Sequence, residues 1–332
     1  MYQRGQSRLS SLQFGLSLLE AVKAPYSLEQ AENDLRHGIK NRTRHFLEIC
    51  DSEVFSKPEG VFGRLFSQAR ISKEHLSSMT ARQGLESTLL ELAIKGVSLD
   101  IDEFKGRKQV IRPGLRMTVD ASDMDRARGH SIPFLSSGSS GKSLRTPIDI
   151  PGLRLLASCI PSVLKFLESG DLPVVLYYPM PSGSGIMHLI AFSLIGKPPS
   201  AWFAQWMHSP WWSNQSGIKL ATMIAGFRLR GISLPAPRLA DIKQPAAMAK
   251  WLKQHCPKGV VISSFTGSAI HLVQTAKREG IVLPPIVFLL GGEPLTDRKR
   301  RALEQDGHRV FPWYSSVETG RLGMGCLSPR HA

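Results

Sequence analysis

Hydrophobic residues in the first third of the chain recur with the period of a helix. Leucines fall at intervals of three and four between residues 9 and 19, and this spacing predicts a surface helix near the N-terminus. A similar pattern runs from Leu76 to Leu92, where Gly84 and Gly96 punctuate the helical sequence. We therefore predict a helical N-terminal region over residues 1–105.

The pattern changes after a polar connector at residues 105–127. Three short apolar runs have the length and composition of buried strands: Val174–Tyr178, Val260–Ser263 and Ile286–Leu290. Helical patterns lie between them at Met248–Gln254 and Ala269–Arg278. Strands that alternate with helices are typical of a mostly parallel sheet flanked by helices. We expect an α/β protein in which this region covers residues 106–332 and the proline-rich stretch Leu234–Arg238 forms a loop.

Composition and charge narrow the class of protein. The 332 residues are 42% hydrophobic and 21% charged, an ordinary globular balance that excludes disordered, collagen-like and disulfide-scaffold chains. Lys and Arg number 42 against 27 Asp and Glu, so the net charge is +15. This charge favours anionic partners such as nucleic acid, phosphorylated cofactors or acidic membrane surfaces. Because the basic residues are dispersed, with Arg298–Arg301 as the densest run, we do not expect nucleic-acid binding.

Cysteine usage and hydropathy bear on the compartment. The four cysteines lie far apart without a C-x-x-C pair, so we expect a cytoplasmic protein without a disulfide framework or zinc ribbon. No apolar run approaches the ~18 residues that a membrane span needs. Cys326 and His331 are five positions apart, but two ligands alone favour an ordinary thiol and a surface histidine over a metal site.

A segment of small and hydroxylated residues follows the apolar run Ile132–Leu135 and precedes the strand-like run Thr146–Ile150. Its members are Ser136, Ser137, Gly138, Ser139, Ser140, Gly141 and Lys142. Small residues let backbone amides approach an anion and the lysine adds positive charge, so a phosphate-binding loop is favoured over a flexible linker. A Walker loop requires G-x-x-x-x-G-K-[ST]. Since Ser136 stands where its first glycine belongs, a P-loop NTPase is the weaker alternative.

A second candidate segment begins where an apolar strand ends in the tetrapeptide Gly291–Pro294. A charged helix at Thr296–Gln305 and a short strand at His308–Trp313 follow, and this strand leads to Tyr314 and Glu318. Ligands of parallel sheets bind at the strand ends. The aromatic ring could stack on the base of a nucleotide. The carboxylate four residues later could hold a metal ion that binds the phosphates of the same nucleotide. A core tyrosine and a solvated loop acid are the alternative interpretation.

Together, the two segments resemble the motifs of the adenylate-forming ligases, most closely the phenylacetate–CoA ligase branch. In that branch the loop reads roughly T-S-G-T-T-G-K-P and is followed by G-A-E-P and Y-G-x-[ST]-E. The order and spacing agree over roughly residues 105–326, including the Met180–Gly185 turn after a strand. The resemblance implies the fold of the N-terminal part of such a ligase. It also implies that ATP and a carboxylic acid, aryl or fatty, give an acyl-adenylate and pyrophosphate, after which a thiol of coenzyme A or a carrier protein takes the acyl group.

The resemblance also implies a role for each matching residue. The loop from Ser136 to Lys142 would hold the β- and γ-phosphates of ATP. Tyr314 would stack on adenine and Glu318 would bind Mg²⁺, with Lys142 and Glu318 as the catalytic residues. The pocket for adenine and the acyl group would be lined by the backbone of Gly291, Gly292, Glu293 and Pro294.

The acyl pocket would take its remaining walls from Val261–Thr266 and Ser182–Met187. His188 follows this second stretch, where a hydrogen-bonded histidine at a helix start is favoured over one that polarises the acyl carboxylate. The tryptophans between residues 202 and 212 favour a core or pocket wall over base stacking, because no Lys or Arg lies among them. Arg298–Arg301 is most simply a solvated helix face, with attraction of the phosphates of coenzyme A as the alternative.

The chain departs from the branch at several positions. Ser143 replaces the loop proline, Ser315 replaces the glycine after the tyrosine, and Val317 removes a hydroxyl that would contact the phosphates. The chain ends at Ala332, 14 residues after Glu318, so the resemblance implies that the mobile C-terminal ligase domain is absent. We therefore expect nucleotide binding to survive better than turnover, and a non-catalytic relative that binds nucleotides or nucleic acid is an alternative.

Overall fold

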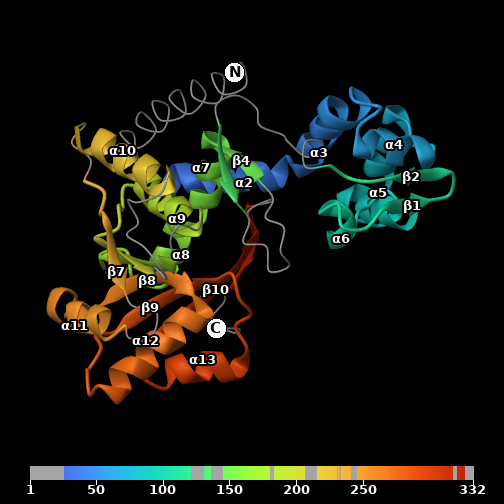
Figure 1. Cartoon of the computed structure of the whole chain (residues 1–332). Helices are drawn as coiled ribbons and strands as arrows, with labels where there is room; N and C mark the ends of the chain where they lie inside the picture. Colours follow the sequence, from blue (N-terminus) through green and yellow to red (C-terminus); the bar gives the residue numbers. More distant parts are fainter. Residues whose placement is uncertain are drawn as a thin grey trace. The chain divides into compact units, whose positions relative to one another are not determined.

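The protein forms two compact units, one comprising Asn33–Arg126 and the other Met1–Glu32 with Ala127–Ala332. The structure is a computed structural model (Figure 1). It describes residues 26–120, 131–135, 145–179, 183–205, 215–229, 231, 233–240, 245–316 and 320–325. The leucine-rich helix predicted between residues 9 and 19 lies outside these residues. Helix α2 (Leu28–Lys40) begins in the larger unit and continues into the smaller one.

The smaller unit is mostly helical. Its elements are α3 (Arg42–Cys50), the π-helical turn η1 (Asp51–Phe55), α4 (Val61–Gln68), α5 (Lys73–Ile94), α6 (Ile101–Phe104) and a hairpin of β1 (Val110–Arg112) and β2 (Leu115–Met117). The helix predicted at Leu76–Leu92 is confirmed as α5, with a break where Gly84 adopts a φ of 79°. Val110 and Met117 join the same buried cluster as Leu65 and Leu76, so this unit continues past residue 105.

The larger unit is built on a seven-stranded sheet. Its strands are β5 (Val174–Pro179), β6 (Ala201–Gln205), β7 (Pro237–Ala240), β8 (Val260–Phe265), β9 (Ile286–Gly291), β10 (Arg309–Ser316) and β11 (Gly320–Met324). They lie in the order β11-β10-β9-β8-β5-β6-β7, and every neighbouring pair is parallel except β10 and β11. The predicted α/β class with a mostly parallel sheet is therefore confirmed.

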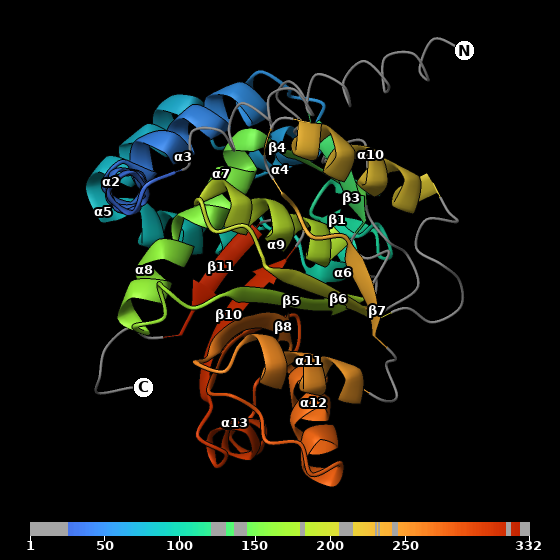
Figure 2. The same ribbon diagram turned by 90° about the vertical axis from the view of Figure 1, so that its left-hand side faces the viewer.

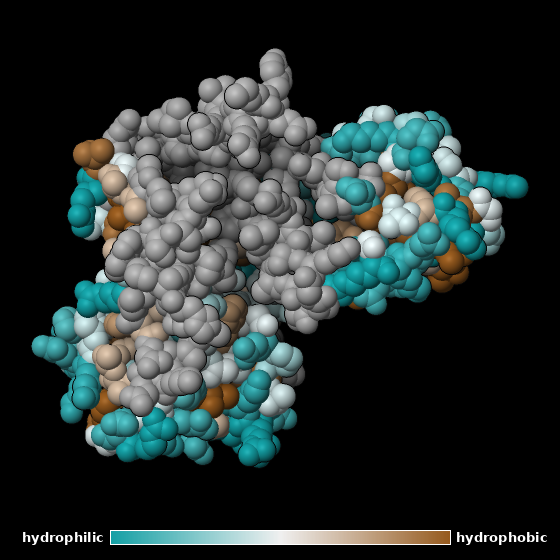
Figure 3. Space-filling model, viewed as in Figure 1, coloured by the Kyte–Doolittle hydropathy of each residue, from teal (hydrophilic) through white to brown (hydrophobic). Residues whose placement is uncertain are grey.

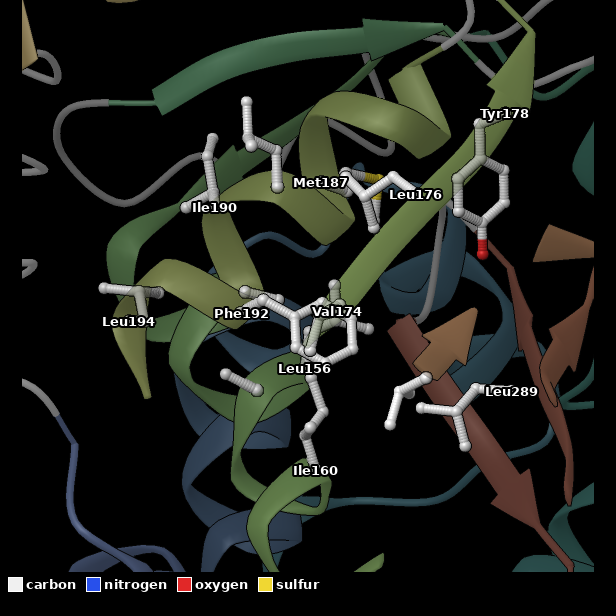
Figure 4. Packing of buried hydrophobic residues seen from close by; sticks show 14 of the residues in the cluster. Leu156, Ile160, Val174, Leu176, Tyr178, Met187, Ile190, Phe192, Leu194 and Leu289 are labelled. Carbon is white, nitrogen blue, oxygen red and sulfur yellow. The ribbon is translucent and has the colours of Figure 1, made fainter. Parts of the chain in front are cut away.

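Helices cover both faces of this sheet (Figure 2). They are α7 (Ile150–Ser158), α8 (Ile160–Phe166), α9 (Gly183–Leu194), α10 (Gln215–Leu229), α11 (Ala246–His255), α12 (Thr266–Arg278) and α13 (Asp297–Glu304). Successive strand residues point to opposite faces, so Leu176 packs with α7–α10 while Val175 packs with α11–α13. Figure 4 shows Val174 beside Phe192 of α9 and Leu156 of α7, and Leu176 beside Met187 of α9, in the first of these two clusters.

The strands β6 and β7 were not predicted from the sequence. The stretch Leu234–Arg238 was expected to be a loop, and this is wrong at its end because Pro237 begins β7. Proline lacks a backbone N–H, but it is tolerated as the first residue of an edge strand, which is where β7 lies. Trp202 of β6 is completely buried in the core, one of the two positions (core or pocket wall) that were predicted for the tryptophans.

Candidate functional site

The order of the strands reverses between β5 and β8. From β5 the chain adds β6 and β7 on one side, and it then returns to add β8, β9 and β10 on the other. Connections that leave neighbouring strands in opposite directions open a crevice beyond their carboxyl ends, and ligands of parallel α/β sheets bind there. We therefore take as the candidate site the carboxyl edge, defined as the ends of β5, β8, β9 and β10.

Gly291 is the last residue of β9 and Gly292 follows it at the carboxyl edge, and the backbone of each lies close to an aromatic ring. A Cβ on Gly291 would lie 2.6 Å from Cδ1 of Trp313, which neighbours it on β10. Gly292 has a φ of +76°, and its Cβ would lie 2.6 Å from the ring of Phe265 on β8. Because a side chain at either position would clash with a ring, the backbone can turn here only if both residues are glycines. The tetrapeptide Gly291–Pro294, which was predicted to line the pocket for adenine and the acyl group, thus begins at the carboxyl edge.

The side chain of Glu293 has a structural partner. Its Oε2 accepts a hydrogen bond of 2.7 Å from the backbone N–H of Gly267, and the Thr266 hydroxyl donates to the Glu293 carbonyl at 3.3 Å. A carboxylate here satisfies an amide at the start of α12 and complements the helix dipole. The side chain therefore fastens the turn after β9 to the beginning of α12. Pro294 is exposed, and its carbonyl accepts from Lys299 Nζ at 3.4 Å.

Tyr314 lies beside this turn because β9 and β10 run in parallel, with Leu290 paired to Pro312. Its side chain is 70% exposed, so it does not belong to the core. The pairing of β10 with β11 is irregular between Tyr314 and Ser315, which locally interrupts the regular strand geometry. The structure thus brings together the predicted glycine turn and the predicted stacking tyrosine at adjacent strand ends.

Several predicted site residues lie outside the described residues: Ser136, Ser137, Gly138, Ser139, Ser140, Gly141, Lys142 and Glu318, together with Cys326 and His331. The strands that flank the predicted phosphate loop are described. They are β3 (Ser131–Leu135) and β4 (Arg145–Asp149), which pair antiparallel from Ser131 with Asp149 to Leu135 with Arg145. A Walker loop leads from a strand into a helix, whereas this segment leads into a strand. The local structure therefore disfavours the P-loop alternative.

A buried polar chain crosses the point where the strand order reverses. Tyr178, near the end of β5, shares a hydrogen bond of 2.9 Å with the hydroxyl of Ser263 on β8. Its ring stacks on the imidazole of His188 from α9, with ring centroids 4.8 Å apart. His188 Nδ1 lies 2.8 Å from the carbonyl of Ser184, so this nitrogen carries the hydrogen and Nε2 faces the tyrosine hydroxyl at 3.4 Å.

Burial determines the charge state of this polar chain. It lowers the pKa of His188 to about 4, against the opposing effect of the Ser184 hydrogen bond, and the positive charge of Arg321 lowers it further. Burial also raises the pKa of Tyr178 well above its ordinary value, although the hydrogen bond from Ser263 acts in the opposite direction. Both side chains are neutral at pH 7, so the polar chain supplies neither a cation nor a phenolate.

Sequence reasoning missed Tyr178, Trp313 and Arg321, whereas Ser263 lies within the predicted pocket wall Val261–Thr266. A signal existed for Tyr178, because it places a hydroxyl near the end of an otherwise apolar strand. Arg321 had no such signal, since its partners are remote in sequence: its Nη1 donates to the thiol of Cys159 at 2.9 Å. The basic run Arg298–Arg301 lies on α13, where Arg300 forms an ion pair of 3.0 Å with Glu304. Hydrophilic residues dominate the surface around this helix (Figure 3).

Comparison with known proteins finds no family model that matches the sequence and no matching curated protein. In the part of the chain that the structure describes, none of the helices has the length and apolar character required to cross a membrane. Within the same residues, no three His, Cys, Asp or Glu side chains are grouped so as to hold a metal ion. Cys50, Cys159 and Cys256 are all buried.

Proposed function

We propose that the protein is an adenylate-forming ligase, of the kind that activates a carboxylic acid with ATP and transfers the acyl group to coenzyme A or another thiol. The observation that carries this proposal is the position of two motif segments at the carboxyl edge. The Gly291–Pro294 turn begins at the end of β9, and Tyr314 lies near the end of the adjacent parallel strand β10. The mostly parallel sheet and the hairpin around the phosphate loop support the same assignment.

The reaction needs alignment and neutralisation of charge more than it needs an acid or base. A carboxylate oxygen attacks the α-phosphorus of ATP, the bond from that phosphorus to the bridging oxygen breaks, and pyrophosphate leaves. The thiol sulfur then attacks the acyl carbon and AMP leaves. Lys142 and the amides of its loop would hold the outer phosphates, and Tyr314 would hold adenine by stacking. Mg²⁺ held by Glu318 would neutralise phosphate charge.

Tyr314 allows the sharpest test of nucleotide binding, because an exposed ring can be changed without disturbing the core. We expect Tyr314→Ala to weaken ATP and AMP alike by about 1–3 kcal/mol, whereas Tyr314→Phe keeps the stacking face and binds like the unmodified protein. Calorimetric titration with each nucleotide measures both. Equal binding by all three proteins would contradict the stacking role.

Lys142 and Glu318 test the phosphate and metal roles. Lys142→Ala should weaken ATP more than AMP, since the loop touches only the outer phosphates, and Glu318→Ala should lose Mg²⁺-dependent ATP affinity while remaining folded. Lys253→Ala, an exposed change on α11, is the matched control and should bind normally. Equal losses of affinity for ATP and for AMP in Lys142→Ala would contradict the assignment of this loop to the outer phosphates.

Pyrophosphate release tests the reaction itself. An adenylating enzyme forms pyrophosphate only when a carboxylic acid is supplied. Release of phosphate without an acid would indicate an NTPase instead. Tight nucleotide binding without any product would indicate a non-catalytic relative, and a steep loss of binding with added salt would indicate a nucleic-acid partner.

A further inference from the structure

Arg321 is a partly buried cation with one hydrogen-bonding edge that is shielded from solvent. It lies on β11 opposite Ser315 of β10, at the carboxyl edge. Its Nη1 donates to Cys159 Sγ, whereas its Nε and Nη2 are shielded from solvent and have no hydrogen-bond partner among the residues that the structure describes. These two nitrogens form one edge of the planar guanidinium, and their N–H bonds point in the same direction. That edge is the fork that binds a carboxylate through two parallel hydrogen bonds.

Among the described residues, no acidic side chain neutralises the charge of Arg321. Within the described residues, its electrostatic partners are the side chains of Cys159 and Tyr178, neither of which is a carboxylate. Burial raises the pKa of the Cys159 thiol, against the opposing effect of the arginine, so the sulfur accepts its hydrogen bond as a neutral group. A buried cation without a counter-ion is costly, and an anion that enters the site removes this cost.

The guanidinium stacks on Trp313, which belongs to a connected series of aromatic side chains. Its central carbon lies 3.8 Å from the centroid of the Trp313 ring, which partly stabilises the charge through a cation–π interaction. The Trp313 ring contacts that of His188 at 5.5 Å, and Tyr178 contacts both His188 and Phe265. The free edge therefore belongs to a wall of aromatic side chains. Such a wall suits a flat aromatic body attached to the anion.

We propose that the Nε–Nη2 edge of Arg321 binds the carboxylate of an aryl acid and so selects the acid substrate. This inference rests on the proposed ligase function and names the substrate class for its site. Because both nitrogens are shielded from water, the ligand enters only when the packing around β11 opens. Once bound, its carboxylate meets the cation in a low-dielectric environment, where the attraction is much stronger than in water.

The test compares benzoate with benzamide, a neutral molecule of nearly the same shape, in the absence of ATP. Ligand-observed NMR titration of the full chain gives both affinities. We expect benzoate to bind about 10- to 100-fold more tightly than benzamide, the range expected for charged hydrogen bonds. Arg321→Met should reduce the affinity for benzoate to that for benzamide. Arg321→Lys should give an intermediate preference for benzoate, because lysine keeps the positive charge but lacks the two parallel N–H donors.

Arg309→Met is the matched control. Arg309 lies at the opposite end of β10 and donates to the carbonyl of Leu167, so its loss should leave the benzoate preference unchanged. Equal affinity of the unmodified protein for the two ligands, or a preference that survives in Arg321→Met, would overturn the proposal. If Arg321→Met does not fold, the comparison with Arg321→Lys decides. Failure here with normal ATP binding and pyrophosphate release would leave the ligase proposal standing, so the two are distinguishable.

Discussion

Protonation of His188 should couple the stability of the larger unit to pH. Its pKa is lowered from 6.5 to about 4 by burial, so the unfolded chain takes up a proton near pH 6.5 that the folded protein refuses until about pH 4. The free energy of unfolding that depends on this residue is therefore fully present above pH 6.5 and is lost as the pH falls toward 4. At about 1.4 kcal/mol per pH unit, the loss approaches about 3 kcal/mol.

The assay is urea denaturation, followed by tryptophan fluorescence, at pH values from 8 to 4. His188→Phe keeps a ring that can stack on Tyr178 but loses the hydrogen bond to Ser184, so it should be about 1 kcal/mol less stable at pH 7. Between pH 7 and pH 4 it should lose about 3 kcal/mol less than the unmodified protein. Burial also lowers the pKa of His308, but that residue contributes to both proteins and cancels in the difference.

His255→Gln, an exposed change on α11, is the control and should follow the unmodified protein across the pH range. The reasoning would be refuted if His188→Phe and the unmodified protein lost stability equally between pH 7 and pH 4. That result would mean that the folded and unfolded states bind this proton alike, so that the imidazole is not held neutral by its surroundings.

The turn after β9 gives two further predictions, both measured by chemical denaturation. Gly291→Ala should destabilise the protein by about 1–3 kcal/mol, because its Cβ would lie 2.6 Å from the Trp313 ring. Gly226→Ala, in an open position of α10, should instead stabilise it by about 0.5–1 kcal/mol, and equal effects at the two glycines would contradict the packing argument. Glu293→Ala should cost about 1 kcal/mol through the lost bond to Gly267, while ATP affinity is retained, and a selective loss of ATP affinity would show that the carboxylate binds the ligand.

The central strands could be predicted from the sequence, and the physical reason is their burial. Strands such as Ile286–Leu290 are covered on both faces and so read as continuous apolar runs. The strand β7 gave no such signal because it lies at the sheet edge and begins with Pro237. The order of the strands was also hidden, since a parallel neighbour can come from almost anywhere in the chain.

The candidate site could be predicted only in part. The glycines of the turn after β9 are required by backbone geometry, which leaves a trace in the sequence. The hydrogen bond of the Glu293 side chain could not be predicted from the sequence, because its partner Gly267 is 26 residues away. The contact of Arg321 with Cys159 spans 162 residues, and no local pattern encodes a pairing over that distance.

The reversal of strand order also has a consequence for how the chain is made. Tyr178 of β5 and its partner Ser263 of β8 are 85 residues apart, so β5 is synthesised long before its neighbour on that side exists. Until then, the backbone hydrogen-bonding groups on the side of β5 that will face β8 cannot make the bonds of the folded sheet, and the side chains of this strand are almost all ones that the folded protein buries. Such an edge is slow to pair and prone to aggregation. The nascent larger unit should therefore depend on chaperones during the interval between the emergence of β5 and that of β8.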